Sequence, residues 1–200
     1  LPEEQPIDSI SFPPEQQAYV QWIMGDNPEA IQARAAKARS KDLLLKYADF
    51  QTRYPGLLVQ SVVGEALFEL NAVSLLGYDE ASVRTALEPL VDSLIRIDWN
   101  RRQLDTAWAK LFSAAAIVEV LNLSDSSFSD EDLLLLLSTM PELKKVNLTG
   151  TEFSDEQVDS IRAHSKIETI VLTGTQLSEV GYQKLINHLP SADVISDYSM

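Results

Sequence analysis

The two histidines, His164 and His188, are the first residues in this chain whose type and spacing could do chemistry. They lie 24 residues apart, and two imidazoles brought together could form a proton-sensing pair or part of a metal site. No third ligand repeats beside them, because the equivalent upstream residue is Thr139. Each also follows a helical pattern, where a partly cationic ring suits the C-terminal end of the helix dipole. We therefore expect helix-terminal histidines and no metal.

An acidic cluster between residues 125 and 132 has the carboxylate density of a cation site. Its members are Asp125, Asp130, Glu131 and Asp132. The cluster lacks the glycine-containing loop of alternating acidic ligands that calcium needs in an EF-hand. Asp130 to Asp132 are better explained as first-turn carboxylates that the helix dipole stabilises. The sequence thus predicts neither a metal nor a cofactor.

Motifs for catalysis are missing as well. The chain has no cysteine, which removes thiolate nucleophiles, disulfides and sulfur-ligated zinc. There is no G-x-S-x-G nucleophile motif, and the Thr-Gly-Thr turns lack the glycine spacing and the lysine of a phosphate-binding loop. We expect a non-enzymatic protein without catalytic residues. An enzyme would instead need a pocket near Trp99 and Trp108.

The overall charge excludes two kinds of partner. Thirty acidic against sixteen basic residues give a formal charge of −14, so the field of the protein repels phosphate backbones and anionic lipid. No apolar run reaches the roughly 20 residues of a membrane span. A basic island is interpreted as a solvated helix face; it consists of Arg34, Lys37, Arg39, Lys41 and Lys46. We expect a protein partner of unknown identity, no nucleic acid and no membrane insertion.

The elements that carry these residues are organised by an internal repeat. The segment LKKVNLTGTEFSD at 143–155 recurs 24 positions later as IETIVLTGTQLSE at 167–179. Val118, Leu121 and Leu123 continue the apolar frame upstream, and looser copies begin near Leu94 and Leu67. In each unit an alternating apolar stretch predicts a short strand, and a helical pattern follows it. The unit is therefore a strand, a turn and a helix.

The turns and helix starts repeat with the strands. Ser129 with Asp132, and Ser154 with Gln157, have the spacing at which a cap residue and the third helical residue satisfy each other's free amides. Apolar pairs recur at the hydrophobic-staple positions: Phe128 and Leu133, Phe153 and Val158, Leu177 and Tyr182. Gly150 and Gly174 follow the strands, where a tight bend favours a positive φ.

This pattern resembles the leucine-rich repeat, in its bacterial, ribonuclease-inhibitor-like form with short helices. The family pattern maps onto Leu143, Val146, Leu148, Thr151 and Phe153. The resemblance implies an α/β right-handed solenoid whose parallel sheet lines the concave face. One departure is consistent: the buried Asn or Cys of the family is replaced by Ser126, Thr151 and Thr175, and by Arg102 in a weaker unit. The ladder beneath the turns must then be built from hydroxyls or be absent.

The sequence divides into three regions. Residues 1–13 predict an extended tail, residues 14–66 a helical N-terminal cap, and residues 67–200 the repeats, which are strongest over 118–190. Within the cap region, Tyr19, Trp22 and Ile23 share a helical face, Asn27-Pro28 predicts a helix start and Tyr54-Pro55-Gly56 a helix stop. The apolar stretch 57–70 fits a helix or a strand. Such a cap is needed because stacked repeats expose their core at each end.

Strand alternation then predicts a binding face. Val146 and Leu148 point to the core, so the residues between them face the concave side. The predicted face consists of Arg96, Asp98, Val120, Asn122, Lys145, Asn147, Thr169 and Val171. The family resemblance implies that this face binds a protein.

Two questions stay open at this point. In an alternative reading, the chain is a structural or regulatory subunit whose helical N-terminal region binds a partner through Tyr19 and Trp22, with the repeats as a scaffold. The first residue is Leu1 instead of Met, and together with the lack of cysteine this favours the periplasm or the cell surface, with the cytoplasm as the alternative. The oligomeric state is open.

Overall fold

A computed structural model describes residues 28–61, 66–161, 164 and 166–198. The predicted tail and the helix that carries Tyr19 and Trp22 lie outside the described residues. The chain divides into two compact units, Leu1–Asp42 and Leu43–Met200. The division falls inside α2 (Pro28–Arg53), which begins at the predicted proline and ends just before Tyr54-Pro55-Gly56. The sequence analysis treats 28–38 and 43–50 as separate helical segments, but they form one continuous helix.

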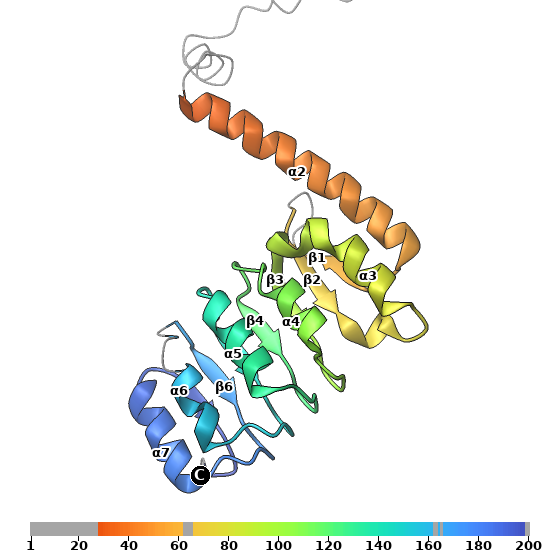
Figure 1. The fold of residues 1–200 in the computed structure, drawn as a ribbon. Coiled ribbons are helices and arrows are strands. Elements are labelled where there is room, and N and C mark those ends of the chain that lie inside the picture. The colour runs from red at the N-terminus through yellow and green to blue at the C-terminus, as the bar shows by residue number, and fades with distance from the viewer. Residues whose placement is uncertain (1–27, 62–65, 162–163, 165, 199–200) are drawn as a thin grey trace, which may run out of the picture. The chain divides into compact units, whose positions relative to one another are not determined.

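The second unit contains a seven-stranded sheet of mostly parallel strands (Figure 1). The strands occur in sequence order: β1 (Leu58–Gln60), β2 (Phe68–Asn71), β3 (Leu94–Asp98), β4 (Val120–Asn122), β5 (Lys145–Asn147), β6 (Thr169–Val171) and β7 (Asp193–Ile195). β1 pairs with β2 antiparallel, and every later pairing is parallel. The apolar stretch 57–70 therefore forms strands, and the sheet begins before residue 67.

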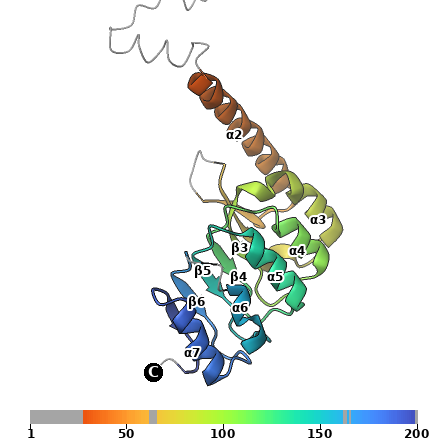
Figure 2. The same cartoon turned by 60° about the vertical axis from the view of Figure 1, so that its left-hand side comes forward.

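Helices connect the parallel strands. They are α3 (Glu80–Leu87), α4 (Thr106–Phe112), α5 (Asp130–Thr139), α6 (Val158–Ile161) and α7 (Glu179–His188), with short 3₁₀ helices η2 (Ala72–Leu75), η3 (Glu88–Ser93) and η4 (Asp155–Gln157). In both views the helices α3 to α7 lie on one face of the sheet (Figures 1 and 2). No described helix covers the opposite face, which we call the open face. The protein is thus an α/β fold with a sheet covered on one side.

Part of the core is a column with one apolar residue from each of the strands β3 to β7. Ile97, Leu121, Val146, Ile170 and Val194 pair in register on neighbouring strands. All five are buried. The predicted alignment of Leu121, Val146 and Ile170 is therefore confirmed. Because β-strand side chains alternate, this register turns the residues on either side of each core position toward the open face.

The helix starts follow the repeat. Ser129, Ser154 and Ser178 cap α5, η4 and α7, and the predicted capping box between Ser154 and Gln157 is present. Asp79 and Asp105 have the same role for α3 and α4. Each cap accepts a hydrogen bond from an amide that the helix leaves unpaired. The connections therefore start their helices by one local mechanism in five successive units.

The turns after the strands share a left-handed conformation. Gly150 and Gly174 have φ of 67° and 68°, as predicted, and Arg101 and Asp125 adopt 57° and 55° at the equivalent positions. The sequence analysis misses the last two, because neither residue type signals a positive φ as glycine does. The turn therefore depends on its place in the unit and not on glycine.

Hydroxyl groups fill the space beneath these turns. Thr151 Oγ1 donates to the Leu148 carbonyl at 2.6 Å, and Thr175 Oγ1 donates to the Leu172 carbonyl at 2.8 Å. Ser126 Oγ instead donates to the carbonyl of Trp99, one unit upstream, at 2.6 Å. The hydroxyl-based arrangement is thus present, and at Ser126 it joins neighbouring units.

The C-terminal half of α2 packs against the start of the sheet. Phe50 is buried, and the rings of Tyr47 and Phe68 stack with centroids 4.8 Å apart. Tyr54 contacts both Phe50 and Tyr78. These aromatic contacts cover the apolar edge that an antiparallel β1 alone would leave exposed.

Candidate protein-binding face

The open face brings together all eight residues predicted from strand alternation. Arg96, Val120, Lys145 and Thr169 pair in sequence across β3 to β6 and form one row. Asp98, Asn122, Asn147 and Val171 form a second row, two residues further along each strand. The placement of these side chains on one surface is therefore as the alternation requires.

The rows extend beyond the predicted residues. Glu69 and Asn71 on β2 pair with Arg96 and Asp98, and Asp193 and Ile195 on β7 pair with Thr169 and Val171. The sequence analysis omits these four residues. Adding the 24-residue period to Thr169 and Val171 leads directly to Asp193 and Ile195, so the signal for β7 is present in the sequence. For β2 the signal is weak, because its unit is longer.

Arg96 is held by a neighbour on its own strand. Its Nε donates to Asp98 Oδ2 at 2.8 Å, and its Nη2 donates to Asp98 Oδ1 at 3.2 Å. Asn122 Nδ2 donates to the same Asp98 Oδ1 at 3.1 Å. The Asp98 bonds, together with the nearby Glu69 carboxylate, raise the pKa of Arg96. The guanidinium of Arg96 is thus already paired within the chain.

The two asparagines of the second row are oriented by the turns. Asn122 Oδ1 accepts from the Ser124 amide at 3.1 Å. Asn147 Oδ1 accepts from the Thr149 amide at 3.0 Å and from Thr149 Oγ1 at 2.7 Å. Because the turn occupies both carbonyl oxygens, the amide nitrogens are directed away from it: Asn122 Nδ2 bonds to Asp98, whereas no described acceptor bonds Asn147 Nδ2.

Lys145 is exposed at the centre of the first row. Its neighbours in register are Val120 on β4 and Thr169 on β6, and neither carries a charge. The adjacent Lys144 behaves differently: its Nζ lies 2.8 Å from Glu119 Oε1, and its hydrogen bond to Glu119 raises its pKa. Lys144 is therefore part of an internal ion pair, whereas Lys145 is exposed on the open face.

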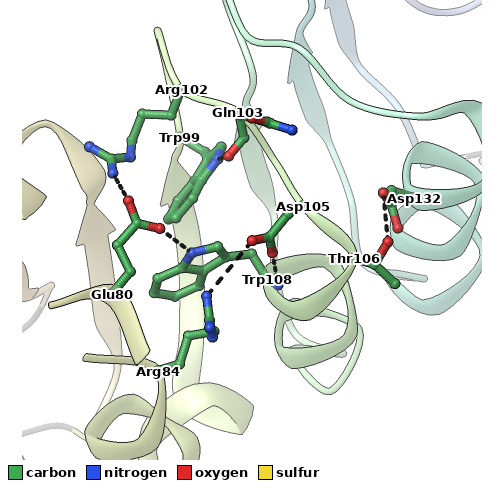
Figure 3. A network of polar contacts seen from close by, with 9 residues as sticks. All are labelled: Glu80, Arg84, Trp99, Arg102, Gln103, Asp105, Thr106, Trp108 and Asp132. Carbon is green, nitrogen blue, oxygen red and sulfur yellow. Dashed lines mark hydrogen bonds and ion pairs between the residues drawn. The ribbon is translucent and has the colours of Figure 1, made fainter. Parts of the chain in front are cut away.

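A network of polar contacts surrounds Trp99 and Trp108, near the place where an enzyme would need its pocket (Figure 3). Both indoles are fully buried, with ring centroids 4.6 Å apart. Glu80 accepts from Trp108 Nε1 at 2.8 Å and from the Arg102 guanidinium. Beside them lies a hollow of about 360 Å³, lined by Glu80, Arg101, Arg102, Gln103 and Asp105. The Glu80 bonds join the start of α3 to α4 and to the turn after β3.

The histidines lie where helix endings were predicted. His188 is the last residue of α7, and His164 follows α6 closely. Burial lowers the pKa of His164, against the opposing effect of its hydrogen bond to the Leu137 backbone. Over the ranges that the structure describes, no group of three or more His, Cys, Asp or Glu residues is placed to hold a metal ion.

The acidic cluster is shared among helix and turn positions. Asp130, Glu131 and Asp132 form the first turn of α5, as predicted. Asp132 is buried and accepts from the Ser129 hydroxyl at 2.9 Å. Asp125 lies in the preceding turn, 3.6 Å from Arg101. Asp132 thus bonds to the serine that precedes its helix, and Asp125 lies beside the Arg101 side chain.

The basic island lies on α2. Lys41 and Lys46 are exposed there, and the side chains of Arg34, Lys37 and Arg39 lie outside the described residues. None of the helices in the described part of the chain combines the length and apolar character that a bilayer crossing requires.

No protein-family model matches this chain, and no curated protein matches it either. The open face carries three acidic residues and two basic ones, namely Glu69, Asp98, Asp193, Arg96 and Lys145. Both signs of charge are therefore available to a partner on this face.

Proposed function

We propose that the chain is a leucine-rich-repeat protein that binds a protein partner on the open face. The observation that supports this most directly is the register of two rows of polar and aliphatic side chains across β2 to β7. Repeats that stack in this way form a solenoid, and the sheet of a solenoid presents one continuous surface. In this proposal the helices and the core hold that surface in place.

The shape of the face suits a protein more than a small molecule. Six strands at a spacing of about 4.8 Å give rows roughly 24 Å long. Small ligands favour enclosed, mostly apolar pockets, whereas these rows lie on a sheet face of mixed polarity. The mixture of amides, charges and aliphatic residues such as Val120 and Val171 matches the composition of transient protein interfaces.

Charge reversal on the face tests the proposal. Binders are first selected from a displayed library of protein fragments, and their affinities are then measured for the wild type and for the double variant R96E/K145E. We expect a loss of at least tenfold, because two contacts on the face change sign. Lys110→Glu with Lys184→Glu is the matched control: both lysines lie on helices, α4 and α7, and the change in net charge is the same.

Two outcomes would contradict the proposal. One is unchanged affinity in the double variant, which circular dichroism must show to be folded, since Arg96→Glu breaks the pair with Asp98. The other is equal loss in the control. Unchanged affinity combined with loss on deleting residues 1–27 would favour the alternative, in which the N-terminal region binds the partner.

A further inference from the structure

The open face contains one cation that the rest of the chain leaves available. Arg96 is bonded twice to Asp98, so its charge is already balanced by a carboxylate of the same strand. Lys145 is exposed, and no described residue bonds its ammonium. The nearest charges on the face, at Arg96, Asp98 and Asp193, lie two strands away, or about 10 Å. That separation is comparable to the screening length of about 8 Å at physiological salt.

Two glutamates lie next to the residues that pair with Lys145 on the neighbouring strands, and both interact with Lys144. Glu119 and Glu168 each precede by one residue the strand positions that flank Lys145. Glu119 forms an ion pair with Lys144 at 2.8 Å, and Glu168 adds to the field that raises the pKa of Lys144. Lys144 therefore pairs with Glu119 and lies in the field of Glu168, whereas no described residue bonds the Lys145 ammonium.

A second donor stands beside Lys145 on the same strand. The turn occupies Asn147 Oδ1 with two bonds from Thr149, and no acceptor among the described residues bonds Asn147 Nδ2. Residues two apart on a strand project to the same side, about 6.6 to 6.8 Å apart along it. The ammonium and the amide thus form a pair of donors, with Val120 and Val171 as the aliphatic neighbours.

We propose that the partner places an aspartate or glutamate side chain on Lys145 and Asn147, with aliphatic residues on both sides of it that pack on Val120 and Val171. This inference rests on the proposed function of the open face. The acid belongs to a side chain and not to a chain end, because captured terminal carboxylates are held by nests of backbone amides. The strand amides here are used in the sheet.

Peptide selection tests this chemistry without a known partner. Random linear peptides displayed through their C-termini, which removes free terminal carboxylates, are selected on the full chain. We expect the enriched peptides to carry Asp or Glu between aliphatic residues. A synthetic peptide from this set is then titrated into the wild type and into Lys145→Gln, Lys145→Arg and Lys144→Gln, with affinity measured by fluorescence anisotropy.

The expected pattern separates Lys145 from its neighbour. Lys145→Gln should weaken binding about five- to tenfold, Lys145→Arg should retain most of the affinity, and Lys144→Gln should change it less than twofold. Replacing the acid of the peptide by its amide should cost the same factor in the wild type and nothing further in Lys145→Gln, because the two changes remove one contact.

The failures are distinguishable. Amide NMR signals report where the peptide binds. If peptides without an acid shift the signals of β3 to β6, or if Lys145→Gln and the amide peptide act additively, the acidic contact is wrong while the binding face stands. If no peptide is enriched, or the shifts fall on the helices, both the contact and the proposed function are overturned.

Discussion

Gly181→Ala should destabilise this protein, although the same change in most helices stabilises them. Gly181 lies in the first turn of α7, where alanine is ordinarily favoured over glycine by about 1 kcal/mol. A Cβ at this position would collide with the Asp155 carboxylate, approach its Cγ at 2.6 Å and lie 2.7 Å from Leu177 Cδ1. The side chain of Asp155 fills the space that the glycine leaves.

The cost follows from what Asp155 does there. Its Oδ1 accepts from the Ser178 amide at 2.8 Å, and its Oδ2 accepts from the Ser178 hydroxyl at 2.5 Å. These bonds lower the pKa of Asp155 and tie η4 to the next helix. A displaced carboxylate loses both bonds, each with a net contribution of about 0.5 to 1.5 kcal/mol. Against a gain of about 1 kcal/mol from helix propensity, we expect a net loss of about 1 kcal/mol.

A double-mutant cycle isolates this contact. In an Asp155→Ala background the collision with the carboxylate is absent and only the contact with the flexible Leu177 side chain remains. Gly181→Ala should therefore be about 2 kcal/mol more favourable in that background than in the wild type, and this difference is the coupling energy. Urea unfolding, followed by circular dichroism and by the fluorescence of buried Trp99 and Trp108, measures the four free energies of unfolding. A stabilising Gly181→Ala in the wild type would refute the packing of Asp155 on α7.

Four further substitutions test the turns, the hydroxyl bonds and the buried histidine. Ser126→Ala should lower the free energy of unfolding by about 1 to 3 kcal/mol in urea melts, because it leaves the Trp99 carbonyl without its donor; a neutral result would contradict a link between units. Gly174→Ala and Gly77→Ala should each cost about 1 to 2 kcal/mol by the same measurement, since both glycines have positive φ without close neighbours, and a neutral change at either would count against that backbone. Burial lowers the pKa of His164, so the unfolded state binds more protons and stability falls as the pH drops below about 6.5. Urea midpoints at pH 7 and pH 5 should therefore differ less in His164→Gln than in the wild type, and an equal difference would contradict the burial of the ring.

Much of the fold can be predicted from the sequence because its signals are local. The 24-residue period, the alternation around Val146 and the serines before α5, η4 and α7 are signals in the sequence itself, and the sheet register and caps agree with them. The antiparallel β1 carries no such signal, since a short apolar run fits a strand or a helix equally well. The left-handed backbone of Arg101 and Asp125 is likewise imposed by the neighbouring units.

At the candidate site too, the sequence predicts where a side chain lies but not which residue it bonds to. Alternation is sufficient to place Arg96 and Lys145 on one face. It says nothing of which cation is already bonded, because that depends on the rotamers of Arg96 and Asp98 on one strand and of Asn122 on the next. The pairing of Arg96 with Asp98 is therefore found only in the structure.

An acidic contact on a protein with a formal charge of −14 has a physical consequence for association. At separations beyond the screening length, an acidic partner does not interact with single side chains of the protein. It is repelled there by the net negative charge of the whole protein. In the proposed mode of binding, the partner meets at contact a face with three acidic and two basic residues, where no described residue bonds the Lys145 ammonium. An acidic segment that cannot reach Lys145 meets the repulsion without the compensating bond, so its binding is disfavoured. On this proposal, the acidic surface contributes to selectivity by rejecting such segments.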